Sequence, residues 1–350
     1  MPVCRWILNL PLLFLLTSVT AVRASTDIDP LFASNDTLAV TVVAPLATLM
    51  LDRPLDAYLP AKFSYTGADG KLVELDIGVR TRGRFRRQVE NCQFAPLRLN
   101  FKTSQAAGTL FANQDKLKLV THCQNKSPRY QQAVLNEYLA YRIFNMLTDI
   151  SFRARLLRVT YVDTDTDNAS MDSLAIIVEH QDQLAERIGT ETVVTQRITA
   201  QELDPEYSAL TALFQYFLGN TDFSQIAVAP GEKCCHNHEL LVAPGLRYYS
   251  VPYDFDMTGF VNAPHAGANP KFKLRSVRQR LYRGRCVNNQ QLPAAIQVFQ
   301  DRRDEIYDLI NTREDVTKHM RRLHIRFVNS FFHTVDSQRN IDKNLLDACI

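Results

Sequence analysis

This chain of 350 residues has little tryptophan, few long apolar runs and almost no excess of one charge over the other. The single tryptophan, Trp6, lies in the N-terminal stretch, and no later segment is apolar for long enough to be expected to cross a bilayer. No internal repeat or low-complexity tract is visible. Lysine and arginine number 40 against 37 aspartates and glutamates, a net charge of +3. This balance gives no general case for nucleic acid or an anionic membrane as a partner.

The N-terminus has the pattern of a secretory signal peptide. Arg5 precedes the uncharged, mostly apolar stretch 6–22, and small residues stand three and one positions before a cut after Ala24. An N-terminal membrane anchor is the alternative, but polar residues interrupt the apolar stretch. We therefore predict that residues 1–24 are removed and that 25–36 form a polar leader. The protein is then exported, to the periplasm or the cell exterior, and does not span the membrane.

Six of the seven cysteines follow the predicted signal peptide. An even number of cysteines in an exported protein favours disulfides, although the sequence does not choose the pairing. Zinc is the alternative, because residues 234–238 read Cys-Cys-His-Asn-His. Adjacent cysteines converge poorly on one metal ion, so we expect disulfides. The six cysteines are Cys92, Cys123, Cys234, Cys235, Cys286 and Cys349.

The first half of the mature chain is rich in strand patterns. Residues 62–65 and 72–82 alternate apolar and polar side chains on either side of an Asp-Gly turn, which is typical of a hairpin. Val-, Leu- and Thr-rich residues 38–51 also predict a strand. Further strands are predicted over 97–102, 116–120, 154–162 and 174–179.

The second half is mainly helical. Apolar residues follow a helical stripe over 131–147, and similar stripes occupy 210–218, 294–311 and 316–332, with a short strand pair at 239–241 and 248–251. The pattern predicts an α+β fold of two lobes. The first lobe, 37–182, would be an antiparallel sheet with one helix, and the second, 183–350, mainly helices.

A basic cluster stands where a predicted strand runs into a turn. Five arginines occur in residues 80–87, with Gly83 among them. Guanidinium groups suit phosphate oxygens, and a glycine lets backbone N–H groups approach an anion. The alternative is a solvated basic edge. We propose phosphate contacts for Arg80, Arg82, Gly83 and Arg84.

An acidic cluster follows the last predicted strand. Asp254 and Asp256 come before a glycine turn, and Asp222 and Asn237 lie upstream. Magnesium takes oxygen ligands, and phosphoryl transfer needs a carboxylate that orients the attacking hydroxyl. Any one of these residues could instead be a turn or cap residue. His236 could be a general base, but the sequence shows no partner for it.

Several short motifs, in this order, resemble the CotH family, the spore-coat protein H group of atypical kinase-like proteins. They span roughly residues 72–285 and include an Arg-x-Arg-Gly turn, a Pro-Leu-Arg-Leu-Asn-Phe strand, an Asn-Glu-Tyr-Leu-Ala helix, an Asn-Thr-Asp turn and a Pro-Tyr-Asp-Phe-Asp segment. The resemblance implies a bilobal protein-kinase-like fold. It also implies the use of ATP and Mg²⁺ to phosphorylate protein hydroxyls.

Residue roles follow from the same resemblance. Asp222 would be the catalytic carboxylate, and Asp254, Asn237 and Asp256 would hold the metal. Arg98 would bind phosphate and pair with Glu137 on the helix. Glu179, which ends a strand, would belong to the nucleotide site. Arg98 stands where a lysine is commoner, and the two are not equivalent donors.

Two other functions remain open at this point. ATP is scarce outside the cytoplasm, so the chain could be a catalytically inactive module that binds an envelope or surface partner. A third possibility is phosphoester hydrolysis, with Asp222, Asp254 and Asp256 holding two cations. The partner expected for an active enzyme is a protein substrate, not nucleic acid.

Overall fold

The computed structural model describes Met1 and residues 28–230, 232–242 and 247–350. The predicted signal peptide falls outside the described residues, apart from Met1. In the part that is described, no helix has both the length and the apolar character needed to cross a membrane.

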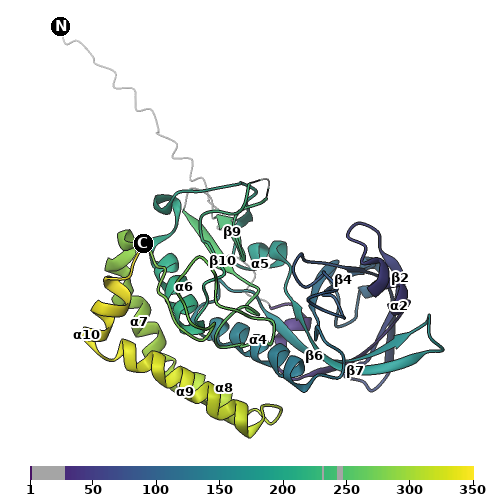
Figure 1. Cartoon of the computed structure of the whole chain (residues 1–350). Helices are drawn as coiled ribbons and strands as arrows, with labels where there is room; N and C mark the ends of the chain where they lie inside the picture. The colour runs from purple at the N-terminus through teal and green to yellow at the C-terminus, as the bar shows by residue number, and fades with distance from the viewer. Residues whose placement is uncertain (2–27, 231, 243–246) are drawn as a thin grey trace.

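The first half of the chain closes into a barrel of seven strands in the order β1-β2-β3-β4-β5-β7-β6 (Figure 1). Most neighbours are antiparallel, but β1 and β6 pair in parallel and close the barrel. The strands are β1 (Leu38–Ala44), β2 (Leu59–Thr66), β3 (Leu72–Thr81), β4 (Leu97–Phe101), β5 (Lys116–Val120), β6 (Ala154–Asp163) and β7 (Ala169–Val178).

Alternating apolar residues of the strands fill the barrel interior. Phe63 lies at its centre, with its ring centroid 5.4 Å from that of Phe101 and 4.8 Å from that of Phe111. The predicted hairpin is confirmed by the β2–β3 pairing. The strand expected over 38–51 is wrong beyond Ala44: Pro45 follows, and a helix begins at Leu46. Short helices α1 (Pro30–Ala33), α2 (Leu46–Asp52) and α3 (Thr103–Ala106) accompany the barrel.

The second half is mainly helical, as expected, and also carries a small sheet in the order β10-β9-β8. The strands are β8 (Glu191–Thr192), β9 (His238–Val242) and β10 (Tyr248–Pro252). The helices are α4 (Pro128–Leu147), α5 (Gln181–Arg187), α6 (Pro205–Leu218), α7 (Leu292–Asp301), α8 (Arg303–Thr312), α9 (Lys318–Val335) and α10 (Gln338–Ile341). Helix α4 lies between the barrel and the later helices (Figure 1) and shares one apolar core with α6, α7 and α9.

The bilobal kinase-like fold with an antiparallel-sheet N-lobe is therefore wrong. The described residues form a closed, mixed barrel joined to helices. The reason is the parallel β1–β6 pair, in which Leu38 lies opposite Leu157 and Ala44 opposite Asp163. Each strand has an ordinary alternating pattern, and the pattern contains no information about a partner so distant in the sequence.

Replacing Phe63 by alanine tests the packed barrel. Because the ring is fully buried, we expect Phe63→Ala to lower the free energy of unfolding by about 3–5 kcal/mol. Leu72 on β3 is 70% exposed, so Leu72→Ala should change it by less than about 0.5 kcal/mol. Urea denaturation measures both. Equal effects of the two substitutions would show that the barrel interior is not packed as described.

Candidate functional site

A cleft of about 750 Å³ brings the basic and acidic clusters together. It lies between the loop after β3 and the turns that precede β9 and follow β10. Among the residues proposed for the site, the cleft is lined by Arg82, Gly83, Arg84, Asp222, Asn237, Asp254 and Asp256. These residues come from segments far apart in the sequence, so their meeting is a property of the fold.

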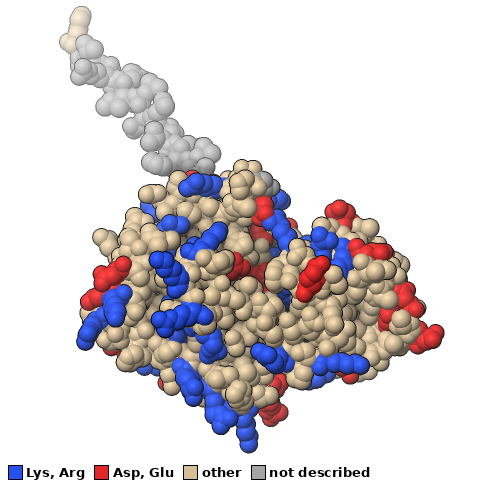
Figure 2. Space-filling view, viewed as in Figure 1, with Lys and Arg blue, Asp and Glu red and all other residues tan. Residues whose placement is uncertain are grey.

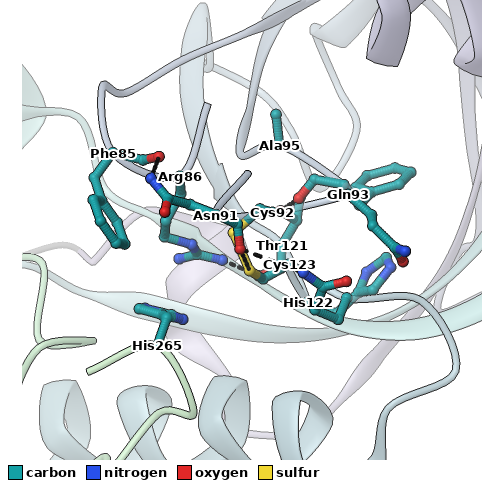
Figure 3. The surroundings of a disulfide bond; sticks show 12 residues. Phe85, Arg86, Asn91, Cys92, Gln93, Ala95, Thr121, His122, Cys123 and His265 are labelled. Atoms are coloured by element: carbon teal, nitrogen blue, oxygen red, sulfur yellow. Dashed lines mark hydrogen bonds between the residues drawn. A yellow bond between two sulfur atoms is a disulfide. The ribbon is translucent and has the colours of Figure 1, made fainter. Parts of the chain in front are cut away.

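A disulfide holds the arginine loop, residues 82–96, against the end of β5. Cys92 is bonded to Cys123, and Arg86 donates a hydrogen bond to the carbonyl oxygen of Thr121 beside it (Figure 3). Arg53, from the end of α2, donates to the carbonyl oxygens of Cys92 and Gln93 at 2.9 and 3.0 Å. The loop is therefore fixed at its far end, while Arg82 and Arg84 face the cleft.

The acidic turn begins directly after β10. Asp254 has a positive φ of 63°, and its backbone N–H donates to the hydroxyl of Tyr141 on α4 at 3.1 Å. The next residue, Phe255, is fully buried, and this anchors the turn. Asp254 therefore reaches the cleft from a turn that α4 holds at one side and the apolar core at the other.

The two carboxylates of this turn differ in their surroundings. Burial raises the pKa of Asp254, and the charge of Asp256 raises it further. Burial would also raise the pKa of Asp256, but a 3.0 Å hydrogen bond from His265 and the charge of Arg86 outweigh it and lower that pKa. The guanidinium of Arg86 lies 3.7 Å from the Asp256 carboxylate. Asp256 is thus the ionised partner of Arg86, and Asp254 is held less firmly in its charged form.

Glu137 lies beneath this pair on α4, in a small cavity that Asp256 and Arg86 also line. Burial raises its pKa well above the ordinary value, and the charges of Asp256 and Asp254 raise it further. Its Oε1 has no hydrogen-bond partner among the described residues. The expected ion pair with Arg98 is wrong: no such contact occurs in the described part of the chain, and the cation beside Glu137 is Arg86.

Arg98 lies outside the cleft, in a row of cations across the outer face of the barrel. It stands opposite Arg80 on β3 and opposite Lys118 on β5. The guanidinium of Arg80 packs over the ring of Tyr58, 5.1 Å from its centroid. Neither Arg80 nor Arg98 lines the cleft, so the structure does not bring these two proposed phosphate ligands to it.

Lys118 is the residue that sequence reasoning missed. Its ammonium lies 4.0 Å from the ring centroid of Tyr253, which lines the cleft, and 3.5 Å from the carboxylate of Glu239. Burial lowers its pKa to about 8, and the charge of Glu239 acts against this. The polar–apolar alternation of β5 puts Lys116 and Lys118 on one face of the strand, and nothing in the sequence shows that Lys118 is the one that lies beside Arg98.

Glu179 has a structural role. Its carboxylate binds the guanidinium of Arg187 through two contacts of 3.0 Å and accepts the backbone N–H of Arg153 at 2.9 Å. Both side chains of this ion pair are buried. Glu179 therefore ties α5 to the start of β6 and does not line the cleft.

Asp222 is positioned by the end of α6. The helix stops at Gly219, whose φ of 65° suits glycine, and the Asn220 side chain then accepts the backbone N–H of Asp222 at 2.8 Å. The Asp222 carboxylate contacts His236 Nε2 at 2.9 Å and accepts from the Asn237 amide at 3.1 Å. His236 therefore does have a partner, which the sequence did not reveal because 14 residues separate the two.

The six cysteines form disulfides, as expected, and the zinc alternative for residues 234–238 is wrong. Cys234 is bonded to Cys235, and Cys286 to Cys349. The adjacent pair is buried, and Cys235 and the following residues His236 and Asn237 line the cleft. The disulfides agree with an exported protein.

A magnesium ion fits the donor set of the cleft. Asp254 and Asn237 offer oxygen atoms, and the Asp254 carboxylate accepts no hydrogen bond within the described ranges. Among the described residues, no three His, Cys, Asp or Glu side chains form a ready metal site. Magnesium, however, commonly takes only one or two carboxylates and completes its shell with phosphate oxygens and water.

Comparisons with known proteins found no protein-family model and no curated protein that matches this chain.

Removing the Cys92–Cys123 disulfide should loosen the arginine loop. The bond closes a separation of 31 residues, so Cys92→Ser/Cys123→Ser should cost about 3–4 kcal/mol. Trypsin under native conditions should then cut after Arg84, Arg86 or Arg87 about tenfold faster.

The control is Cys286→Ser/Cys349→Ser, which opens a separation of 63 residues and should cost about 4 kcal/mol. It should leave cleavage in the arginine loop unchanged. Equal acceleration by both double variants would contradict a local role for the first disulfide.

His122, beside this disulfide, should make the protein less stable in acid. Burial lowers its pKa from 6.5 to about 4, so the unfolded chain binds more protons between these values. The free energy of unfolding therefore falls as the pH falls from 6.5 to 4. His122→Phe, which can keep the packing on Phe94, should make this decline shallower in urea titrations at several pH values. Identical slopes would contradict the assignment.

Proposed function

We propose that this chain is an exported, CotH-like phosphotransferase that uses ATP and Mg²⁺ to phosphorylate hydroxyl groups of proteins. The observation that carries the proposal is the single cleft lined by Arg82, Gly83 and Arg84 on one side and by Asp222, Asn237 and Asp254 on the other. Opposite charges across one cleft suit a metal-bound polyphosphate.

The arginine loop would bind phosphate. The Arg82 side chain is half-buried and makes no ion pair or hydrogen bond among the described residues, and its charge acts on Asp254. Arg84 contacts Glu232 across the cleft. Gly83 lines the cleft with a φ of 81°, and a Cβ there would meet no atom within 4 Å. Planar guanidinium donors then neutralise phosphate charge without a change in fold.

The acidic side would hold the metal and the acceptor. Asp254 and Asn237 would bind Mg²⁺, with Asp256 behind them as the ionised partner of Arg86. When bound, the ion would neutralise charge on the phosphate oxygens. The Asp222 carboxylate, oriented by His236 and Asn237, would accept the proton of the acceptor hydroxyl.

Binding of Mg-ATP tests the proposal and separates the two carboxylates. Nucleotide at 100 times its Kd should stabilise the wild-type protein by about 2.7 kcal/mol. Asp254→Asn should abolish this stabilisation. Asp222→Asn should keep it but lower phosphate transfer to protein about 10²–10⁴-fold. Thermal shifts and radiolabelling from ATP measure the two effects.

Asp301→Asn, an exposed change at the end of α7, is the control and should alter neither. Absence of any Mg-ATP effect in the wild type would instead support an inactive binding module. Turnover of a generic phosphoester without nucleotide would support hydrolysis.

A further inference from the structure

The segment after the acidic turn is strongly one-sided in charge. Between Asp256 and Asp301 the chain has no acidic residue, and residues 271–285 contain two lysines and five arginines. Acidic residues elsewhere in the chain balance the positive charge of this segment, so the net charge of +3 does not reveal it. Figure 2 shows lysine and arginine side chains running from the middle of the viewed face to its lower edge, where α9 lies in Figure 1.

We define the basic ridge as Lys271, Lys273, Arg275, Arg322 and Arg326. The first three alternate along an irregular segment, and the last two belong to α9. All five side chains are exposed, and none forms an ion pair in the described part of the chain. Unpaired cations on one surface favour an anionic partner.

Hydrogen bonds and ring contacts hold the basic segment 271–285 against the rest of the protein. Arg278 donates to the Gly259 carbonyl oxygen at 3.3 Å and packs over the Phe327 ring of α9. Gly259 allows this close approach, because a Cβ there would lie 2.7 Å from the carbonyl oxygen of Val277. Arg280 also donates to the Phe327 carbonyl oxygen, at 2.7 Å. The ridge is therefore held in place before any partner binds.

The ridge adjoins Asp222. Arg283 donates to the carbonyl oxygens of Thr221 and Phe223, the neighbours of Asp222, at 3.1 and 2.6 Å. Its guanidinium also lies 4.9 Å from the ring centroid of Phe272. Phe272 stands between Lys271 and Lys273. One arginine thus links the free lysines to the carboxylate that would receive the acceptor hydroxyl.

We propose that the basic ridge binds an acidic stretch of a protein acceptor and so presents a nearby hydroxyl to Asp222. This inference rests on the proposed function for the role of Asp222. A peptide fits better than a membrane, because none of the exposed large apolar side chains of the described residues lies in the ridge. It also fits better than nucleic acid, because the one aromatic residue between the lysines, Phe272, is half-buried and packed against Arg283.

The test is binding without nucleotide. A fluorescein-labelled peptide of alternating serine and glutamate is titrated with the purified protein, and anisotropy gives the Kd. Lys271→Glu/Lys273→Glu should weaken binding at least about tenfold, and added salt should weaken wild-type binding. Lys102→Glu/Arg158→Glu makes the same charge change at exposed barrel residues and should leave the Kd within about twofold.

Several outcomes would overturn the inference. One is that the ridge variant binds the acidic peptide as tightly as its control variant does. Another is that a serine–lysine peptide binds as tightly as the acidic one. A third is that phosphatidylglycerol vesicles or duplex DNA bind to the ridge and the acidic peptide does not.

The two proposals fail separately. Ridge-dependent peptide binding by the wild-type protein, without any Mg-ATP binding or phosphate transfer, would contradict the proposed function and leave the basic ridge standing. Phosphorylation of the acidic peptide at an unchanged rate by the ridge variant would contradict the role proposed for the basic ridge and leave the proposed function standing.

Discussion

The cleft depends on the compensation of buried negative charge by Arg86. The charge of Asp256 raises the pKa values of both Glu137 and Asp254, and Arg86 and His265 are the groups that stabilise Asp256 as an anion. An unpaired buried carboxylate is costly, so the acidic turn needs this guanidinium. Arg86 in turn depends on the loop that Cys92–Cys123 fixes. A disulfide thus contributes to the electrostatics of the site as well as to stability.

In this arrangement the three carboxyl groups differ in the protonation state that their surroundings favour. Asp256 is favoured as an anion, Glu137 as the neutral acid, and Asp254 lies between them with a raised pKa. Like charges in one buried region cannot all ionise without compensation. A cation at Asp254 would remove the disadvantage of its charged form. The pKa shift and the cleft geometry therefore support one interpretation: Asp254 faces a place suited to positive charge.

Local structure could be predicted from the sequence, and long-range pairing could not. The alternation in β2 and β3 and the stripe of α4 predicted their elements, because periodicity reports which side of an element is buried. The closure of the barrel by β1 and β6 depends on backbone hydrogen bonds that any strand can offer. The same distinction between local pattern and long-range contact applies to the residues of the site. Motif order identified the cleft residues Asp222 and Asp254, whereas the pairing of Arg98 with Glu137 required a tertiary contact, and in the described part of the chain Arg86 is the cation beside Glu137 instead.

Composition has a related limit. A net charge near zero gave no general case for nucleic acid or an anionic membrane, and a sum over the chain says nothing of how charge is distributed in space. The stretch from Met257 to Gln300 contains no carboxylate, and contacts of Arg278 and Arg283 with main-chain carbonyl oxygens hold it beside Asp222. Among the described residues, these arginines donate to neutral carbonyl oxygens and not to carboxylates. The positive electrostatic potential of the nearby unpaired lysines is therefore not cancelled by a neighbouring negative charge. The segregation of charge is therefore built into the same turns that form the cleft, and an acidic acceptor would meet both at once.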